Sequence, residues 1–230
     1  MSYLVSNNKM LINTGKLLTY HIYNIQYTSI IYGYLYNWFA ASNALFAPAG
    51  WHVPTDTELT TLTTYLGGTV VAGGKMKESG TTHWLTPNTG ADNTSGFIGR
   101  PGGNRDFNGV FANIGSYGYW WSSAAYDITN AWNRNLQYNA SNSNRSAYDK
   151  LNGFSIRLIK DDSTLVSSLT DIDNNIYPTV KIGNQVWTCA NWKCTKLNDG
   201  TPIPNVTVNA TWAGLTTLAY CAYDNNEANV

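Results

Sequence analysis

The chain has 230 residues, and its 14 Lys and Arg side chains balance its 14 Asp and Glu side chains, so the formal net charge at pH 7 is zero. This balance argues against nucleic acid as a partner, because phosphate binding needs a concentrated positive surface. Aromatic residues make up 13% of the chain and charged residues only 12%, whereas disordered chains are rich in charge and poor in aromatics. We therefore expect a folded protein that does not bind nucleic acid.

The sequence predicts neither insertion into a membrane nor a secretory signal. No segment approaches the run of about 20 apolar residues that spans a bilayer. Polar residues, among them Asn7, Lys9 and Asn13, interrupt the region where the apolar part of a signal peptide would lie. Because virion proteins need no such leader, we expect a location on a virion surface, with a bacterial cell surface or another extracellular location as the alternative.

Four segments follow one another along the chain. Residues 1–31 form a polar N-terminal extension without clear periodicity, and residues 32–160 are dense in Trp, Gly and Asn. Residues 161–170 are typical of a linker, and residues 171–230 form a second piece.

The spacing of apolar residues predicts two helices. The first covers residues 34–44, where Leu35, Trp38 and Phe39 can share one face. The second begins at an N-cap in residues 54–56, has Glu58 in its first turn and ends at Gly67-Gly68. Its residues that recur at helical spacing are Leu59, Leu62, Tyr65 and Leu66.

Most of the remaining sequence predicts short strands and long loops rich in Gly and Asn. Residues 171–187 indicate two short strands, with turns at residues 173–175 and at Gly183-Asn184. Two helices beside irregular β structure predict an α+β fold.

Several long motifs then identify a family resemblance. Residues 32–41 (YGYLYNWFAA), 49–56 (AGWHVPTD), 115–123 (GSYGYWWSS) and 152–157 (NGFSIR) resemble the Fibrobacter succinogenes major paralogous domain. Shorter motifs at 74–78, 95–97 and 101–106 add to the likeness, which covers residues 32–160 and 171–230. The resemblance implies a C-type-lectin-like fold with two helices, short antiparallel strands and long Gly- and Asn-rich loops.

The order of the two pieces differs from the family. The motifs at 180–187 (VKIGNQVW), 198–204 (NDGTPIP) and 220–224 (YCAYD) resemble the part that comes first in the family. The resemblance therefore implies a circular permutation, in which residues 171–230 complete the domain begun at 32–160. We favour completion within one chain, because a linker raises the effective concentration to roughly millimolar. Completion of a neighbouring chain, which would build a head-to-tail filament, is the alternative.

A polar ribbon over residues 126–148 is the most distinctive segment, since Asn, Ser, Tyr and Asp fill 13 of its 23 positions. Its stretch 132–138 alternates, so that Trp132, Leu136 and Tyr138 point one way and Asn133, Asn135 and Gln137 point the other. We expect the first face to be buried and the second to present a row of amides to solvent. The alternative is an edge hairpin whose polar side chains keep the surface soluble and bind no ligand.

The polar ribbon resembles the variable region of lectin-fold proteins diversified by retroelements. That resemblance implies a contact surface for a host-surface glycan or a protein receptor, because Asn, Tyr and Ser side chains can hydrogen-bond or stack on many ligands. Trp120, Trp121 and Trp132 are expected to hold the scaffold. The predicted contact residues are Tyr126, Asn130, Asn133, Asn135, Tyr138, Asn142, Asn144, Ser146 and Tyr148.

The sequence offers little for catalysis. His21, His52 and His83 have no acidic or Ser partner at a known spacing, and His52 is expected to be a packed structural residue. The segment 171–182 resembles a calcium loop but has Ile at its sixth and twelfth positions, so we expect a turn. Gly-rich motifs at 73–75 and 101–104 lack a full phosphate-loop pattern and predict close backbone approaches. No cofactor is expected, although structural calcium in the Asn and Asp loops stays open.

The three cysteines, Cys189, Cys194 and Cys221, are too few for a disulfide scaffold. The resemblance implies a bridge to Cys221 from a position that Leu158 occupies here, which leaves Cys189 and Cys194 as a candidate pair.

Together these patterns predict a binding protein and not an enzyme. We expect it to be displayed on a phage tail, a similar virion structure or a bacterial surface. The alternative is a structural subunit whose swapped pieces build a homo-oligomer or filament.

Overall fold

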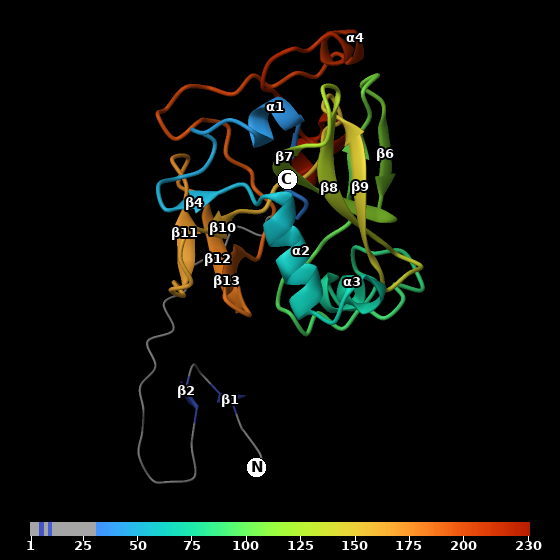
Figure 1. Cartoon of the computed structure of the whole chain (residues 1–230), viewed down its shortest axis with the longest axis vertical. Helices are drawn as coiled ribbons and strands as arrows, with labels where there is room; N and C mark the ends of the chain where they lie inside the picture. Colours follow the sequence, from blue (N-terminus) through green and yellow to red (C-terminus); the bar gives the residue numbers. More distant parts are fainter. Residues whose placement is uncertain (1–4, 7–8, 11–30) are drawn as a thin grey trace.

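The computed structural model of the chain describes residues 5–6, 9–10 and 31–230 (Figure 1). Two short paired strands, β1 (Val5–Ser6) and β2 (Lys9–Met10), lie within the predicted N-terminal extension, of which residues 1–4, 7–8 and 11–30 are outside the described residues. Within the described part of the chain, no helix has the length and apolar character needed to cross a bilayer.

Two five-stranded sheets dominate the structure, and the predicted α+β class is confirmed. The first sheet is antiparallel and has the order β11 (Ser168–Thr170), β12 (Ile176–Ile182), β13 (Gln185–Thr188), β10 (Ile159–Lys160) and β4 (Trp51–His52). The second has the order β6 (Phe111–Ile114), β5 (Gly102–Arg105), β7 (Tyr117–Ala125), β8 (Asn130–Gln137) and β9 (Ser143–Asp149), with β5 and β7 parallel.

The helices are few and short. Figure 1 shows α2 between the two sheets and α3 beside it. The helices are α1 (Trp38–Ala41), α2 (Asp56–Tyr65), α3 (Thr69–Met76) and α4 (Asn209–Ala213), followed by the 3-10 turns η1 (Tyr223–Asn225) and η2 (Glu227–Asn229).

Helix α2 confirms the second predicted helix together with its cap. The Thr55 hydroxyl accepts a hydrogen bond from the Glu58 backbone N–H, and the Glu58 carboxylate accepts one from the Thr55 backbone N–H. This reciprocal capping box satisfies two backbone donors that the first turn leaves free. Leu59, Leu62 and Leu66 are buried as the helical spacing requires, whereas Tyr65 is exposed.

The first predicted helix is wrong in its extent. Residues Leu35–Tyr36 form strand β3, which pairs with β14 (Tyr220–Cys221), so only α1 remains helical. Asn37 caps α1, because its side chain accepts from the Ala40 backbone N–H. A partner strand more than 180 residues away in the sequence thus overrides the local helical pattern.

Helix α3 was not predicted, because its glycines suggested a turn. A Cβ atom at Gly73 would lie 2.1 Å from the Asn142 carbonyl oxygen, and one at Gly74 would lie 2.3 Å from the Gly90 carbonyl oxygen. The predicted close backbone approach is therefore present, but it occurs inside a helix that packs against the loop before β9.

The two strands predicted near residue 180 are confirmed as β12 and β13, joined by the turn at Gly183. The segment that resembles a calcium loop is a turn closed by its own side chain. The Asp171 carboxylate accepts from the backbone N–H groups of Asp173 and Asn175 and from the Tyr177 hydroxyl.

The pieces 32–160 and 171–230 share one interior. Asn191 links them, since its side-chain oxygen accepts from Trp120 Nε1 at 2.9 Å and from Arg157 Nε at 2.7 Å. Its side-chain nitrogen donates to the Tyr32 carbonyl at 2.7 Å. The Tyr32 backbone N–H in turn donates to the Asn229 carbonyl, so the end of the chain lies beside residue 32 of the same molecule.

Two buried arginines extend this junction. The Arg157 guanidinium also donates to the carbonyls of Phe97, Ile98 and Thr188, and burial lowers its pKa to about 9. Arg105 donates to the carbonyls of Gly109, Val206 and Thr207 and lies between the rings of Phe111 and Trp212. Each cation is solvated by carbonyl dipoles from both pieces of the chain.

The cysteines do not form the candidate pair. Cys189, Cys194 and Cys221 are all free thiols, and burial raises the pKa of both Cys194 and Cys221 to about 12.

Replacing Thr55, the N-cap residue of α2, tests whether the capping box stabilises this helix. Thr55→Ala removes the acceptor for the Glu58 N–H, so we expect the free energy of unfolding to fall by about 1 kcal/mol in urea denaturation. Thr57→Ala, an exposed position in the same turn, is the control and should change stability much less. Equal losses in both variants would contradict the capping account.

Candidate functional site

The predicted alternation in the polar ribbon is confirmed by the register of the second sheet. Strand β8 lies between β7 and β9, with Asn133 opposite Trp121 and Ser146 and with Asn135 opposite Tyr119 and Asn144. Paired residues of neighbouring strands point to the same side of a sheet. Asn133, Asn135, Asn144 and Ser146 therefore share one face, which we call the amide face.

The expectation that Asn133 and Asn135 are exposed is wrong. Their exposed fractions are 0% and 4%, because β8 is an inner strand and large neighbours flank both residues. The Asn133 side-chain nitrogen donates to the Ser146 carbonyl, and that of Asn135 donates to the Ser146 hydroxyl. Asn144 donates to the side-chain oxygen of Asn135 at 3.1 Å. The two inner amides thus support β9 and are not available to a ligand.

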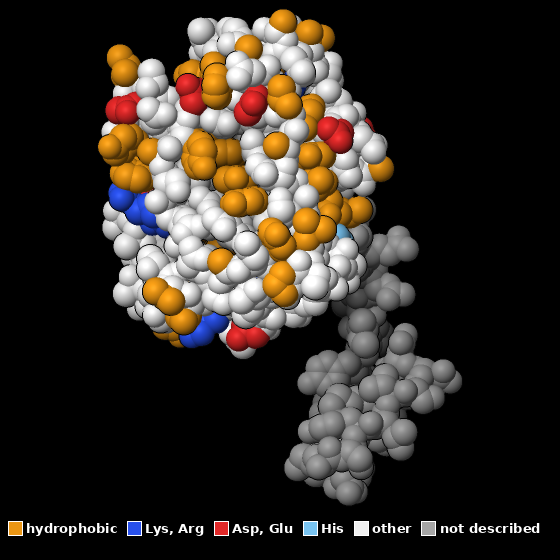
Figure 2. Space-filling view, turned by 90° about the vertical axis from the view of Figure 1, so that its right-hand side faces the viewer, with side chains coloured by type: hydrophobic (Ala, Val, Ile, Leu, Met, Phe, Trp, Pro, Cys, Tyr) orange, Lys and Arg blue, Asp and Glu red, His pale blue; other side chains and the backbone are white. Residues whose placement is uncertain are grey.

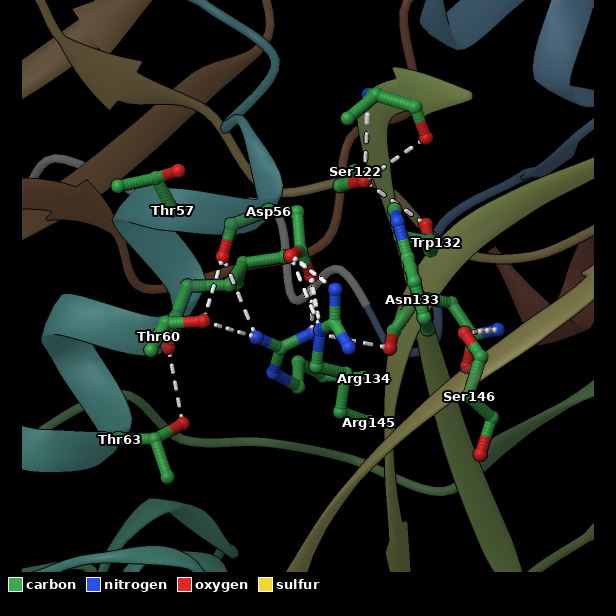
Figure 3. A network of polar contacts seen from close by, with 12 residues as sticks. Asp56, Thr57, Thr60, Thr63, Ser122, Trp132, Asn133, Arg134, Arg145 and Ser146 are labelled. Carbon is green, nitrogen blue, oxygen red and sulfur yellow. Dashed lines mark hydrogen bonds and ion pairs between the residues drawn. The ribbon is translucent and has the colours of Figure 1, made fainter. Parts of the chain in front are cut away.

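The opposite face of β8 is covered by α2 through an ion-pair network (Figure 3). Arg134 Nη1 lies 2.7 Å from Asp56 Oδ1, and Arg145 Nη2 lies 2.8 Å from Asp56 Oδ2. Arg134 also donates to the Thr60 hydroxyl. These contacts lower the pKa of Asp56 against the effect of its burial, so the carboxylate stays charged between the two arginines.

The expected scaffold role holds for two of the three tryptophans. Trp120 and Trp121 are buried in the hydrophobic clusters. Trp132 instead lies half-buried at the surface, with the Arg145 guanidinium carbon 3.3 Å from its ring centroid and Tyr126 against its edge. Tyr126 therefore lies on the side of the sheet opposite the amide face.

The nine predicted contact residues are thus not brought into one surface. Tyr126 and Tyr148 are exposed, at 56% and 40%, but on opposite sides of the sheet. Asn130 caps the β7–β8 turn by donating to Asp127, and Tyr138 packs partly on a hydrophobic cluster. The members that lie together and are at least partly exposed are Asn142, Asn144, Ser146 and Tyr148, which we call the recognition surface.

The loop that begins the recognition surface is fixed from inside by Lys77, which sequence reasoning missed. Its ammonium group is buried and donates to the carbonyls of Thr89, Gln137 and Ala140, each at 2.9 Å. Burial lowers its pKa to about 8. Gly73, which packs against the Asn142 carbonyl, holds the same loop. The motif at 74–78 contains Lys77, but nothing in the sequence reveals the carbonyls that surround it.

A hollow of about 360 Å³ lies at the Tyr148 end of the recognition surface. Asn104 and Asn113 line it from β5 and β6, Asp106 and Phe107 from the loop between these strands, and Asn152 from the loop after β9. Tyr119 and Phe154, stacked at 4.7 Å, also border it. The motif at 101–106 marks part of this lining, but sequence alone does not bring it beside Tyr148.

Charge is sparse on this side of the molecule. Figure 2 shows the side of β6 and β9 as largely uncharged, with hydrophobic side chains among uncharged polar ones. Within the described residues, no group of three or more His, Cys, Asp or Glu side chains is placed to hold a metal ion.

His52 has acidic partners that its spacing did not suggest. Its Nδ1 lies 2.6 Å from Asp161 Oδ1, and its Nε2 lies 2.9 Å from Glu58 Oε1. The hydrogen bond to Glu58 first, and that to Asp161 next, raise the pKa of His52 to about 9 despite partial burial. The cluster joins α2 to the first sheet and holds a proton near neutral pH, which suits a structural ion pair.

A comparison of wild type with Asn135→Ala tests the support role of the inner amides. The variant removes the acceptor for Asn144 and one donor to Ser146, so we expect about 1 kcal/mol less stability in urea. Asn139→Ala, at an exposed position of the following loop, is the matched control and should be neutral. A fully stable Asn135→Ala protein would show that the amide is not structural.

The His52 cluster predicts a pH-dependent contribution to stability. The folded pKa of about 9 exceeds the ordinary value of 6.5, so the stabilisation is complete below pH 6.5 and is lost as the pH rises through 9. Glu58 has a lowered pKa and stays charged in this window. The difference in unfolding free energy between wild type and His52→Gln should therefore shrink from pH 6 to pH 10. A difference that is constant or grows would refute this assignment.

Comparison with known proteins places the chain in a family. The family model described as the Fibrobacter succinogenes major domain matches residues 6–160, more than half of the chain, and the chain belongs to this family. The match begins within the predicted N-terminal extension and does not include residues 171–230. No curated protein and no solved structure matches the chain.

Proposed function

We propose that this member of the Fibrobacter succinogenes major domain family is a ligand-binding protein that recognises a glycan or a protein receptor through the recognition surface. We place it on a virion, such as a phage tail, or on a bacterial surface. The observation that carries the proposal is the difference between the two strands of the polar ribbon. The amides of the inner strand β8 are buried and hold the sheet together, whereas the edge strand β9 presents the exposed Tyr148 and the partly exposed Asn144 and Ser146.

Preorganisation supports this use of the surface. Lys77 fixes the loop at one end of β9, and the hydrogen bonds of Asn133 and Asn135 fix its middle. Side chains on a fixed backbone lose less entropy when they bind. Amide, hydroxyl and tyrosyl groups contact many ligands, and these residue types are typical of adaptable paratopes.

We also propose the finer fold assignment, a circularly permuted C-type-lectin-like domain whose polar ribbon corresponds to a retroelement-diversified variable region. The contact between Tyr32 and Asn229 supports the permutation, since it places the end of one piece at the start of the other. The Asn191 and Arg157 hydrogen bonds are made within one chain, which supports completion in cis over a filament built by exchange.

A binding assay on a glycan array and on a panel of intact bacterial cells tests the proposed function. The triple variant Asn142→Ala/Asn144→Ala/Tyr148→Ala removes three side chains of the recognition surface, and we expect at least a tenfold loss of binding. The matched control, Asn198→Ala/Asn205→Ala/Tyr65→Ala, removes exposed residues of the same types elsewhere and should bind as wild type.

The variant Tyr126→Ala tests whether the ligand binds instead on the Trp132 side of the sheet, opposite the recognition surface. Loss of binding in Tyr126→Ala, with the triple variant unaffected, would move recognition to the Trp132 side and contradict the proposal. Thermal unfolding of each variant separates loss of binding from loss of fold.

A further inference from the structure

The hollow beside Tyr148 contains polar atoms that are held in place but not used by the fold. Asn104 accepts from the Asn113 side-chain nitrogen at 2.8 Å through its oxygen. Asp106 accepts from the backbone N–H groups of Asn108 and Val110 through one carboxylate oxygen. Asn152 donates its side-chain nitrogen to the Asp149 carbonyl. Each side chain is therefore oriented by one of its two polar atoms.

The second polar atom of each of these side chains has no partner among the described residues. These atoms are Asn104 Nδ2, a donor, and Asp106 Oδ2 and Asn152 Oδ1, both acceptors. Since the three residues line one hollow, it offers a fixed donor and two fixed acceptors to a ligand. A polar group that is already oriented costs little entropy when it forms a hydrogen bond to a ligand.

Aromatic rings border the same hollow. Phe107 is 48% exposed and Tyr148 is 40% exposed, and both line it. Solvent-exposed rings beside fixed polar groups match the two chemical sides of a pyranose, whose hydroxyls donate and accept hydrogen bonds while its C–H face is apolar. The volume of about 360 Å³ is at the lower end of small-ligand pockets.

The charged residues that line the hollow favour neutral sugars over anionic ones. Asp106 and Asp149 both border the hollow, and no Lys or Arg is among the described residues that line it. A carboxylate on the ligand would meet like charge without a compensating cation. We propose that the hollow binds one neutral pyranose ring of a glycan, a ligand class that rests on the proposed function and narrows it.

Saturation-transfer NMR tests this inference directly. The probes are the methyl pyranosides of glucose, galactose and mannose, with N-acetylneuraminic acid as the anionic counterpart. We expect saturation of the ring C–H protons for at least one neutral sugar and none for the anionic one. Absence of saturation for all three neutral sugars would overturn the inference.

Two isosteric variants locate the site. Asn104→Asp keeps the oxygen that accepts from Asn113 but replaces the free donor, so we expect about tenfold weaker sugar binding. Asp106→Asn keeps the turn and removes a charge, so discrimination against N-acetylneuraminic acid should decrease. Asn198→Asp, the same change at an exposed distant residue, should have no effect. Equal sugar affinity in wild type and Asn104→Asp would also overturn the assignment.

The experiments distinguish failure of the sugar site from failure of the proposed function. Cell binding that is lost in the triple variant but not inhibited by any of the three neutral sugars would leave the proposed function standing and reject the sugar site. Sugar binding that is lost in Asn104→Asp, together with full cell binding by the triple variant, would establish the sugar site and reject the recognition surface.

Discussion

The hydrogen bonds of the buried Arg157 guanidinium are the interaction on which the structure depends most. A cation in the interior is tolerated only where dipoles replace the water it has lost. Here the dipoles come from both pieces of the chain: the Phe97 and Ile98 carbonyls from one, and the Thr188 carbonyl and the Asn191 amide from the other. Because each piece supplies only part of this solvation, we expect residues 32–160 and 171–230 to fold as one unit.

This shared interior is consistent with the proposed use of an edge strand for recognition. The core is closed by tryptophans and by the buried arginines. Strand β9 adds to it from the edge, through its backbone ladder, the ion pair of Arg145 with Asp56 and the contacts of Tyr148 with the rings of Tyr119 and Phe154. Its outward side chains are held at fixed positions by Lys77 at one end and by Asn133 and Asn135 in the middle. The neighbouring hollow adds oriented polar atoms at the other end.

Local patterns in the sequence predicted the features that depend on residues close together in the chain. The N-cap within residues 54–56 and the alternation over residues 132–138 were both correct. What failed was the exposure of Asn133, because alternation says which residues share a face but not whether that face is covered. The extent of the first helix failed because β14 pairs with Leu35–Tyr36 from the far end of the chain. The hollow could not be predicted, since Asn104 and Asn152 meet only in the folded chain.

Native-state hydrogen exchange with increasing urea is the most direct test of whether the two pieces form one cooperative unit within a single chain. The slowest amides of β7 and β8 and those of β12 and β13 should exchange with the same free energy and the same dependence on urea. These values should not change with protein concentration. Exchange of β12 and β13 at a distinctly lower free energy, or protection that rises with protein concentration, would contradict completion within one chain.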